Sequence, residues 1–119
     1  MTPDTHHAIS YVELGVTDLV ATRAFYESAF GWEFNDYGGA YAGIKSVSGN
    51  GEIGGLNPQS KPSDSGPLIL LYSQDLDASV ASVTQAGGTI AAPPYDYPGG
   101  RRFEFFDPSG NRLGVFTTA

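Results

Sequence analysis

The chain has 119 residues, of which 40% are hydrophobic and 16% charged, a composition that predicts one folded domain and argues against disorder. Six Lys and Arg against 13 Asp and Glu give a net charge of −7, so we expect neither nucleic acid nor an anionic membrane as a partner. The chain has no cysteine, which excludes disulfides and thiolate chemistry, and it has no long apolar run or signal-peptide core, so we expect a cytoplasmic protein.

The first half of the sequence predicts a strand, a helix and three further strands. Residues 9–16 are rich in strand formers. Thr17 or Asp18 is expected to cap the helix, because a short side-chain oxygen accepts hydrogen bonds from free backbone N–H groups. Apolar residues at helical spacing continue to Phe30, and Gly31 predicts the helix end. Three short strands separated by glycine-rich turns follow: 32–37, 41–47 and 52–57.

The second half predicts the same order after a connector rich in Pro and Ser. A strand is expected at 68–73, then a helix capped by Asp75 or Asp77 and ended by Gly87-Gly88. The remaining strands are expected at 89–92, 101–106 and 112–117, with a tight turn at 107–111 between the last two. The predicted order is therefore βαβββ twice.

The two halves also repeat in sequence. A shift of 57 positions places Asp18-Leu19 on Asp75-Leu76 and Gly31 on Gly88. Each half is too small to bury a good core alone, and pairing two halves solves that problem. We therefore expect a single domain over 1–119, with module one at 8–57, a connector at 58–67 and module two at 68–117.

Short sequence words at these places carry a family resemblance that extends from about Ala8 to Phe116. The words are Val16-Thr17-Asp18-Leu19, Phe25-Tyr26, Phe30 to Phe34, Ile53 to Leu56, Ala86-Gly87-Gly88 and Phe106 to Asn111. Together they resemble the vicinal oxygen chelate superfamily of glyoxalase I, bleomycin-resistance proteins and extradiol dioxygenases, in its branch related to lactoylglutathione lyase. The resemblance implies an α+β fold in which two βαβββ modules form a cupped, barrel-like mixed sheet.

The resemblance also implies a divalent metal, held by His, Glu or Gln, that two neighbouring substrate oxygens chelate. The positions at which the family carries these ligands hold Tyr11, Leu68 (or Ile69 after a slip of one residue), Gly114 and a residue within 54–57. Glu52 lies just outside that window and would need a register slip to serve. Leucine and glycine offer no donor atom and an unassisted phenol is a poor ligand, so we expect no cofactor of the usual kind.

Strand alternation extends the expected cavity beyond Tyr11. Glu13 shares a face with Tyr11, the repeat adds Tyr72, and the last strand adds Arg112 and Phe116. Glu13, with Tyr11, is the candidate for chemistry, because a carboxylate that faces a partly apolar cavity has a raised pKa and can act as an acid or a base. The alternative is a solvated or arginine-paired strand residue.

Arg102 and Glu104 share one face of the next-to-last strand, and Phe103 and Phe105 share the other. One interpretation is a polar outer face over a phenylalanine core. In the other, Arg102 reaches an anionic group of a ligand.

Four aromatic residues could also contact a ligand. Trp32 and Tyr41 are candidates for the cavity rim, although aromatic residues on strands also form cores. Tyr95 and Tyr97 belong to the proline-rich segment 93–98, which cannot be a central strand and is expected to be a lid or an edge. Ordinary loop packing is the alternative.

Three functions remain open from the sequence. The first is a metal-free protein that binds a small aromatic or cationic molecule between its modules, since the metal ligands are missing while the aromatic residues remain. The second is a lyase, isomerase or dioxygenase that uses a divalent metal, or Glu13 with Tyr11 as acid or base. The third is a structural or regulatory dimer without a ligand. The resemblance implies a homodimer in each case.

Overall fold

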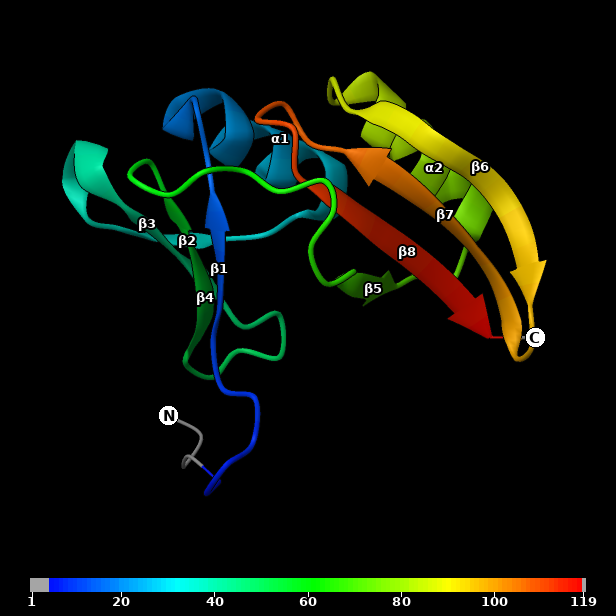
Figure 1. Ribbon diagram of the computed structural model, residues 1–119, viewed down its shortest axis with the longest axis horizontal. Coiled ribbons are helices and arrows are strands. Elements are labelled where there is room, and N and C mark those ends of the chain that lie inside the picture. The colour runs from blue at the N-terminus through cyan, green and yellow to red at the C-terminus, as the bar shows by residue number, and fades with distance from the viewer. Residues whose placement is uncertain (1–4, 119) are drawn as a thin grey trace.

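The computed structural model describes residues 5–118 and contains two βαβββ modules (Figure 1). Module one consists of β1 (Val12–Gly15), α1 (Leu19–Phe30), β2 (Phe34–Asp36), the 3₁₀ turn η1 (Gly38–Ala40), β3 (Ala42–Lys45) and β4 (Glu52–Asn57). Module two consists of β5 (Leu70–Tyr72), α2 (Leu76–Gln85), β6 (Thr89–Tyr97), β7 (Gly100–Phe106) and β8 (Arg112–Thr118). Neither helix in this range is long and apolar enough to cross a membrane.

Each module forms its own four-stranded mixed sheet. The first sheet has the order β1-β4-β3-β2 and the second has the order β5-β8-β7-β6. The pairs β1–β4 and β5–β8 are parallel and the other neighbours are antiparallel. The predicted α+β fold with two βαβββ modules is confirmed. The two sheets do not close into one barrel-like sheet, however, and they lie on the left and right of Figure 1.

The sequence repeat has a physical basis at the two helix starts. Asp18 and Asp75 are extended N-caps whose side chains accept hydrogen bonds from the backbone N–H of Ala21 (3.0 Å) and Ala78 (3.1 Å). These bonds satisfy donors that the first helical turn leaves free. Asp18 and Asp75, rather than the alternatives Thr17 and Asp77, are therefore the caps.

The helix ends do not follow the repeat. Gly31 is a left-handed cap with φ 71°, as predicted. In α2 the left-handed residue is Gly87 with φ 102°, one position before the sequence counterpart of Gly31. That counterpart, Gly88, lies against α1, where an added Cβ would be 2.7 Å from Cε1 of Phe25. Gly88 therefore permits close packing between the modules.

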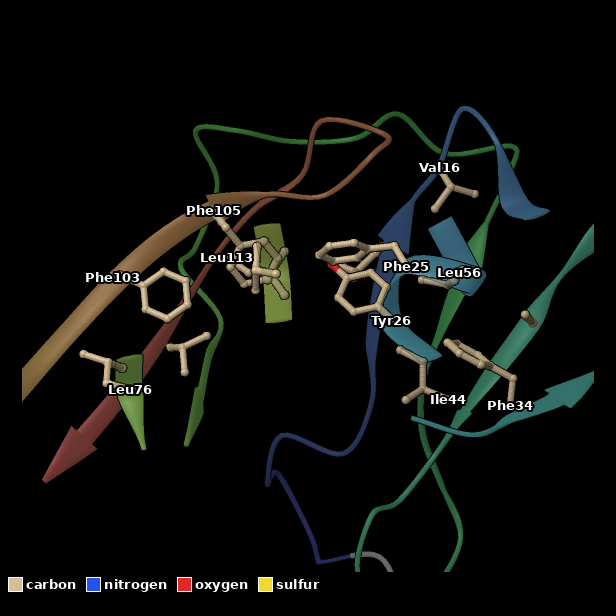
Figure 2. Packing of buried hydrophobic residues seen from close by; sticks show 14 residues of the cluster. Val16, Phe25, Tyr26, Phe34, Ile44, Leu56, Leu76, Phe103, Phe105 and Leu113 are labelled. Atoms are coloured by element: carbon tan, nitrogen blue, oxygen red, sulfur yellow. The ribbon is translucent and has the colours of Figure 1, made fainter. Parts of the chain in front are cut away.

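Both modules share one hydrophobic core. The two helices contact each other, and each packs on strands of its own module. Phe25 and Phe30 of α1 reach across to Phe105 of β7, with ring centroids 5.8 and 5.6 Å apart. Figure 2 shows Phe25 and Tyr26 between the buried side chains of the first sheet and those of the second.

The edge strand β6 is longer than predicted. It continues through Pro93 and Pro94 to Tyr97, whereas the prediction ended this strand at Ala92. The strand pairs only with β7, and its register shifts on both sides of Ala92. Neither proline has a partner residue in β7, and β6 has no strand on its other side, so the missing N–H groups break no ladder. The edge position expected for this segment is confirmed.

A buried polar cluster in the turn between β7 and β8 joins the modules. The Asp107 carboxylate accepts hydrogen bonds from the Tyr26 hydroxyl (2.9 Å) and from the side chain (3.0 Å) and backbone N–H (3.0 Å) of Asn111. Asn111 also donates to the carbonyl of Gly15 (2.7 Å) and accepts from the N–H of Ser63 (2.9 Å). We call these five residues the inter-module latch, because they connect β1, α1, the connector and module two.

We expect Asp107→Asn to lower the free energy of unfolding by about 2–4 kcal/mol. Asp107 is only 4% exposed, and an amide would turn a second donor toward groups that already donate. Urea denaturation measures the change, with Asp64→Asn in the exposed part of the connector as the control. Equal stability of the two variants would contradict a role for the latch.

Candidate functional site

A β-bulge in the first sheet brings a second glutamate to the face that carries Glu13. Ile44 pairs with Gly54 and the next residue, Lys45, pairs with Glu52, so Ile53 has no partner. The extra residue rotates Glu52 onto the face turned away from α1. The bulge therefore brings Glu52 beside Tyr11, to which it is hydrogen-bonded.

Two glycines make room on this face. Glu13, Gly55, Gly43 and Asn35 are successive partners in a row across the four strands. An added Cβ at Gly55 would lie 1.8 Å from the hydroxyl oxygen of Tyr41, and one at Gly43 would lie 2.0 Å from Oε1 of Glu52. The middle of the sheet therefore has space for the long polar side chains of Tyr41 and Glu52.

Four side chains on this face form a continuous line of oxygens. The Tyr11 hydroxyl donates to Oε2 of Glu52 (2.7 Å), and the Tyr41 hydroxyl donates to Oε2 of Glu13 (3.0 Å). The two hydroxyl oxygens are themselves 2.7 Å apart. We call Glu52, Tyr11, Tyr41 and Glu13 the tyrosine–glutamate chain.

Further donors form hydrogen bonds with both glutamates at the ends of the tyrosine–glutamate chain. Oε1 of Glu52 accepts from Asn35 (3.0 Å) and from the Tyr37 hydroxyl (2.8 Å), and Oε1 of Glu13 accepts from Asn57 (3.0 Å). The hydrogen bonds from Asn35 and then Tyr11 hold the pKa of Glu52 below its usual value, despite some desolvation. Glu52 is therefore best stabilised as a carboxylate.

The phenols of the chain resist ionisation. Partial desolvation, followed by the hydrogen bonds with Tyr41 and Glu52, raises the pKa of Tyr11. Desolvation also raises the pKa of Tyr41, and its hydrogen bond to Glu13 acts in the same direction. Both hydroxyls therefore keep their protons at neutral pH and can donate.

The second sheet carries a separate polar network around Glu104, which is 5% exposed. Tyr95 and Arg112 donate to its two carboxylate oxygens, and Arg102 donates to the Tyr95 hydroxyl. The Tyr95 hydrogen bond, followed by Arg112, holds the pKa of Glu104 below its usual value. The Arg102 guanidinium lies over the rings of Tyr95 and Tyr97, 5.3 and 5.5 Å from their centroids.

This arrangement settles which face of β7 carries the polar residues. Phe103 and Phe105 are fully buried on the side of α2, while Arg102 and Glu104 lie on the opposite face with Arg112. Arg102 is held by two aromatic rings and a hydroxyl.

A cavity of about 470 Å³ lies between the modules, and we call it the cleft. Its walls come from the start of module one, the connector and the start of β8. The lining residues are Ile9, Tyr11, Val12, Glu13, Leu14, Gly15, Lys61, Ser63, Gly66, Pro67, Leu68, Ile69, Asn111, Arg112 and Leu113. Three of the predicted site residues, Tyr11, Glu13 and Arg112, are therefore together in one cavity.

The other predicted site residues lie elsewhere. Tyr72 and Phe116 pack edge to face on the second sheet, with centroids 5.5 Å apart. Trp32 stacks on Tyr26 at 4.5 Å and lines an apolar cavity of about 190 Å³, which adjoins the cleft and shares with it Val12, Leu14, Ile69 and Leu113. Tyr41 belongs to the tyrosine–glutamate chain. The remaining three, Arg102, Tyr95 and Tyr97, belong to the Glu104 side of the second sheet.

Sequence reasoning missed the partners that complete both networks. In the first network, Asn35 and Tyr37 donate hydrogen bonds to Glu52, and Asn57 donates one to Glu13. In the second network, Glu104 is the central acceptor. The facing glycines in strands β3 and β4 were a usable signal, because glycine within a strand marks a bulge or a close approach.

The donor atoms at the family's metal positions do not suit a divalent cation. Leu68 and Gly114 have no side-chain donor, and the Tyr11 hydroxyl is already bonded to Tyr41 and Glu52. Between residues 5 and 118 no group of three or more His, Cys, Asp and Glu side chains is placed to hold a metal ion. The usual ligand set therefore does not fit this chain.

Comparison with known proteins identifies relatives over almost the whole chain. The model of the Glyoxalase/Bleomycin resistance protein/Dioxygenase superfamily matches residues 8–115. "Putative glyoxylase CFP32" of Mycobacterium tuberculosis is 30% identical over 115 residues, which cover 90% of this chain and 44% of that protein. "Anthracycline biosynthesis protein DauV" of a Streptomyces species is 28% identical over 91% of this chain and 40% of that protein. The chain thus spans less than half of the length of these curated relatives.

A solved structure matches the fold. It is a glyoxalase/bleomycin resistance protein/dioxygenase family enzyme from Burkholderia phytofirmans, with a TM-score of 0.76 and 22% identity. The match covers 93% of this chain and 98% of the other. At this identity the likeness supports the fold alone.

We expect Gly55→Ala to break the tyrosine–glutamate chain while leaving the fold intact. The new methyl group would occupy the place of the Tyr41 hydroxyl, a side-chain tip that can swing into solvent. The pKa of Tyr41 should then fall toward its usual value, as a titration of ¹³C-labelled tyrosine by NMR would show. Gly39→Ala is the control because an added Cβ there meets nothing within 4 Å. An unchanged Tyr41 titration in Gly55→Ala would contradict the geometry.

We expect Glu104 to contribute stability that is lost in acid. Its pKa is lowered in the folded protein, so the contribution is present above the usual carboxyl value of 4.5 and disappears as the pH falls through the lower folded value. Glu104→Gln should therefore flatten the acid side of a plot of unfolding free energy against pH. The exposed Glu33→Gln is the control. The same acid slope in all three proteins would refute this role.

Proposed function

Because the chain belongs to the Glyoxalase/Bleomycin resistance protein/Dioxygenase superfamily, we propose that it binds a small aromatic or cationic molecule in the cleft between its modules. We propose further that it does so without the superfamily's usual metal. The observation that carries the proposal is the composition of the cleft wall, where Tyr11 and Glu13 stand and Leu68 offers no metal donor.

The size and lining of the cleft suit a small molecule. Its volume of about 470 Å³ is within the range of roughly 300–1,000 Å³ that is usual for such sites. Leu14, Ile69 and Leu113 supply apolar contact surface, and Tyr11 and Glu13 supply polar groups. This combination favours a ligand with a flat apolar body and a polar or charged group.

The electrostatics favour a cation. Arg112 lines the cleft, but its charge is offset by its ion pair with Glu104. Lys61 is the other cation in the lining, opposed by Glu13 and by the net charge of −7 on the whole chain. An acidic protein raises the local concentration of cationic ligands and speeds their binding.

The name of one relative is consistent with a small-molecule ligand, because it refers to anthracycline biosynthesis. That relative is more than twice as long as the matched region, so its name supports only the class of ligand proposed here.

An enzyme is the second candidate function. Glu13 lines the cleft and is hydrogen-bonded to Tyr41, which gives an acid or base beside a bound molecule. A reaction of the lyase, isomerase or dioxygenase type would then use Glu13 with Tyr11, or a divalent metal bound outside the usual positions.

We also propose a homodimer located in the cytoplasm. Each four-stranded sheet has open edges, and Leu70 and Tyr72 of β5 are 38% and 58% exposed. A second copy that covered β5 would bury these apolar side chains. The absence of cysteine agrees with a reducing compartment.

Fluorescence titration with proflavine, a planar aromatic cation, tests the proposed binding function. We expect saturable binding that weakens about tenfold in Glu13→Gln, equivalent to about 1.4 kcal/mol. Glu27→Gln is the control, because Glu27 pairs with Arg23 on the surface of α1. The anion 2-naphthalenesulfonate should bind more weakly than proflavine.

Two results would count against the proposal. Equal binding of the cation and the anion, unaffected by Glu13→Gln, would remove the role of the cleft carboxylate. Stoichiometric Ni, Zn, Mn or Fe in natively purified, untagged protein, measured by mass spectrometry, would favour the metal-dependent enzyme.

A further inference from the structure

The tyrosine–glutamate chain has more hydrogen bonds than protons to fill them. Its four oxygens make three contacts, at 2.7, 2.7 and 3.0 Å, and each contact of this length needs one hydrogen. A phenol carries a single hydrogen and an ionised carboxylate carries none. With Glu13 and Glu52 both ionised, the chain therefore holds two protons for three contacts.

No rearrangement of two protons satisfies the geometry. If both tyrosines donate to the glutamates, the two hydroxyl oxygens face each other at 2.7 Å without a proton. If Tyr41 donates to Tyr11 instead, its oxygen faces the negative Oε2 of Glu13 at 3.0 Å without a proton. Lone pairs opposed at these distances repel, so the arrangement requires a third proton.

The third proton belongs at the Glu13 end. Glu52 accepts three hydrogen bonds, from Asn35, Tyr37 and Tyr11, and these stabilise its ionised form. The pKa of Glu52 is lowered by the same bonds. A single direction of donation then fills every contact, from Glu13 to Tyr41, from Tyr41 to Tyr11 and from Tyr11 to Glu52.

We propose that the tyrosine–glutamate chain binds one proton in addition to those of its two phenols, and that a cation entering the cleft at Glu13 expels this proton. The exchange is balanced: the O–H bond of Glu13 breaks, its electron pair stays on the carboxylate, and the proton leaves to solvent. The cation replaces the lost positive charge, Tyr41 turns to donate to Glu13, and the contact between the two phenol oxygens, now without a proton, opens. The step rests on the proposed function only in its choice of ligand.

Other charged groups surround the chain without replacing the proton. Lys45 comes from β3, the neutral Tyr37 phenol from the residue that follows β2, and Lys61 and Arg112 from the lining of the cleft. Within the described residues, the hydrogen bonds and ion pairs of Glu13 involve Tyr41 and Asn57 and none of these four groups. Among the described residues, none of these groups is therefore an ion-pair partner of Glu13.

A carboxyl titration of the ligand-free protein by ¹³C NMR tests the extra proton independently of any ligand. We expect the Glu13 and Glu52 carboxyl signals to respond together in one common step, because both glutamates belong to one hydrogen-bonded line of oxygens, while Glu27 and Glu33 provide reference titrations. In Tyr11→Phe the chain is interrupted, so the common step should vanish. Tyr41→Phe interrupts it at the neighbouring link and provides a second variant if the first does not fold.

Separate titrations of Glu13 and Glu52 in the usual range in the wild-type protein would overturn the proposal, and so would a common step that survives in both variants. Calorimetry with proflavine in two buffers of different ionisation enthalpy then counts the protons released, and we expect about one per bound cation below the common step. A bound cation without proton release would overturn the exchange. Absence of proflavine binding with the common step present would refute the proposed function and leave the extra proton established.

Discussion

The rest of the structure depends on one buried carboxylate, that of Asp107. Each module has its own sheet, and the shared core alone would hold them together without fixing their relative position. The latch adds directional bonds from Asp107 and Asn111 to α1, to β1 and to the connector. The cleft opens beside this cluster, and Asn111 is part of its wall. The same turn therefore determines how far Tyr11 and Glu13 lie from the start of β8.

Glycine and polar side chains share the outer faces of the sheets in a complementary way. Gly43 and Gly55 leave a shallow space that Glu52 and Tyr41 occupy. In the second sheet Gly114 plays a related part, because an added Cβ would lie 2.5 Å from Leu70. The first sheet uses its space for oxygens and the second for an apolar side chain. The two modules share one architecture, but their sheets differ in chemistry because different side chains cover their glycines.

Much of the fold could be predicted because its signals are local. Asp18 and Asp75 cap helices through contacts three residues away, and Gly31 ends a helix by its own conformation. The end of β6 could not be found in this way, since Pro93 and Pro94 are tolerated only because no strand lies beyond them. The closure of the sheets also escaped prediction, because it depends on contacts between modules.

The candidate site was less predictable than the fold for a related reason. Alternation predicted one face for Tyr11, Glu13 and Arg112, and all three line the cleft, because they lie in or next to strands beside the boundary between the modules. Glu52 depends on a bulge, which breaks alternation; the glycines beside Ile53 indicate such a bulge but do not fix which residue it adds. The positions of Trp32 and Tyr72 depend on which neighbouring rings they meet, and single-strand patterns contain no such information.

The proline pair in β6 has a consequence for association with other chains. An open sheet edge is a template on which a foreign strand can be added through its free N–H and C=O groups. The proline pair removes an N–H donor from this edge, and the register shifts around Ala92 make it irregular. Strand addition to the second sheet is therefore directed away from β6 and toward β5, at the opposite edge beside the connector.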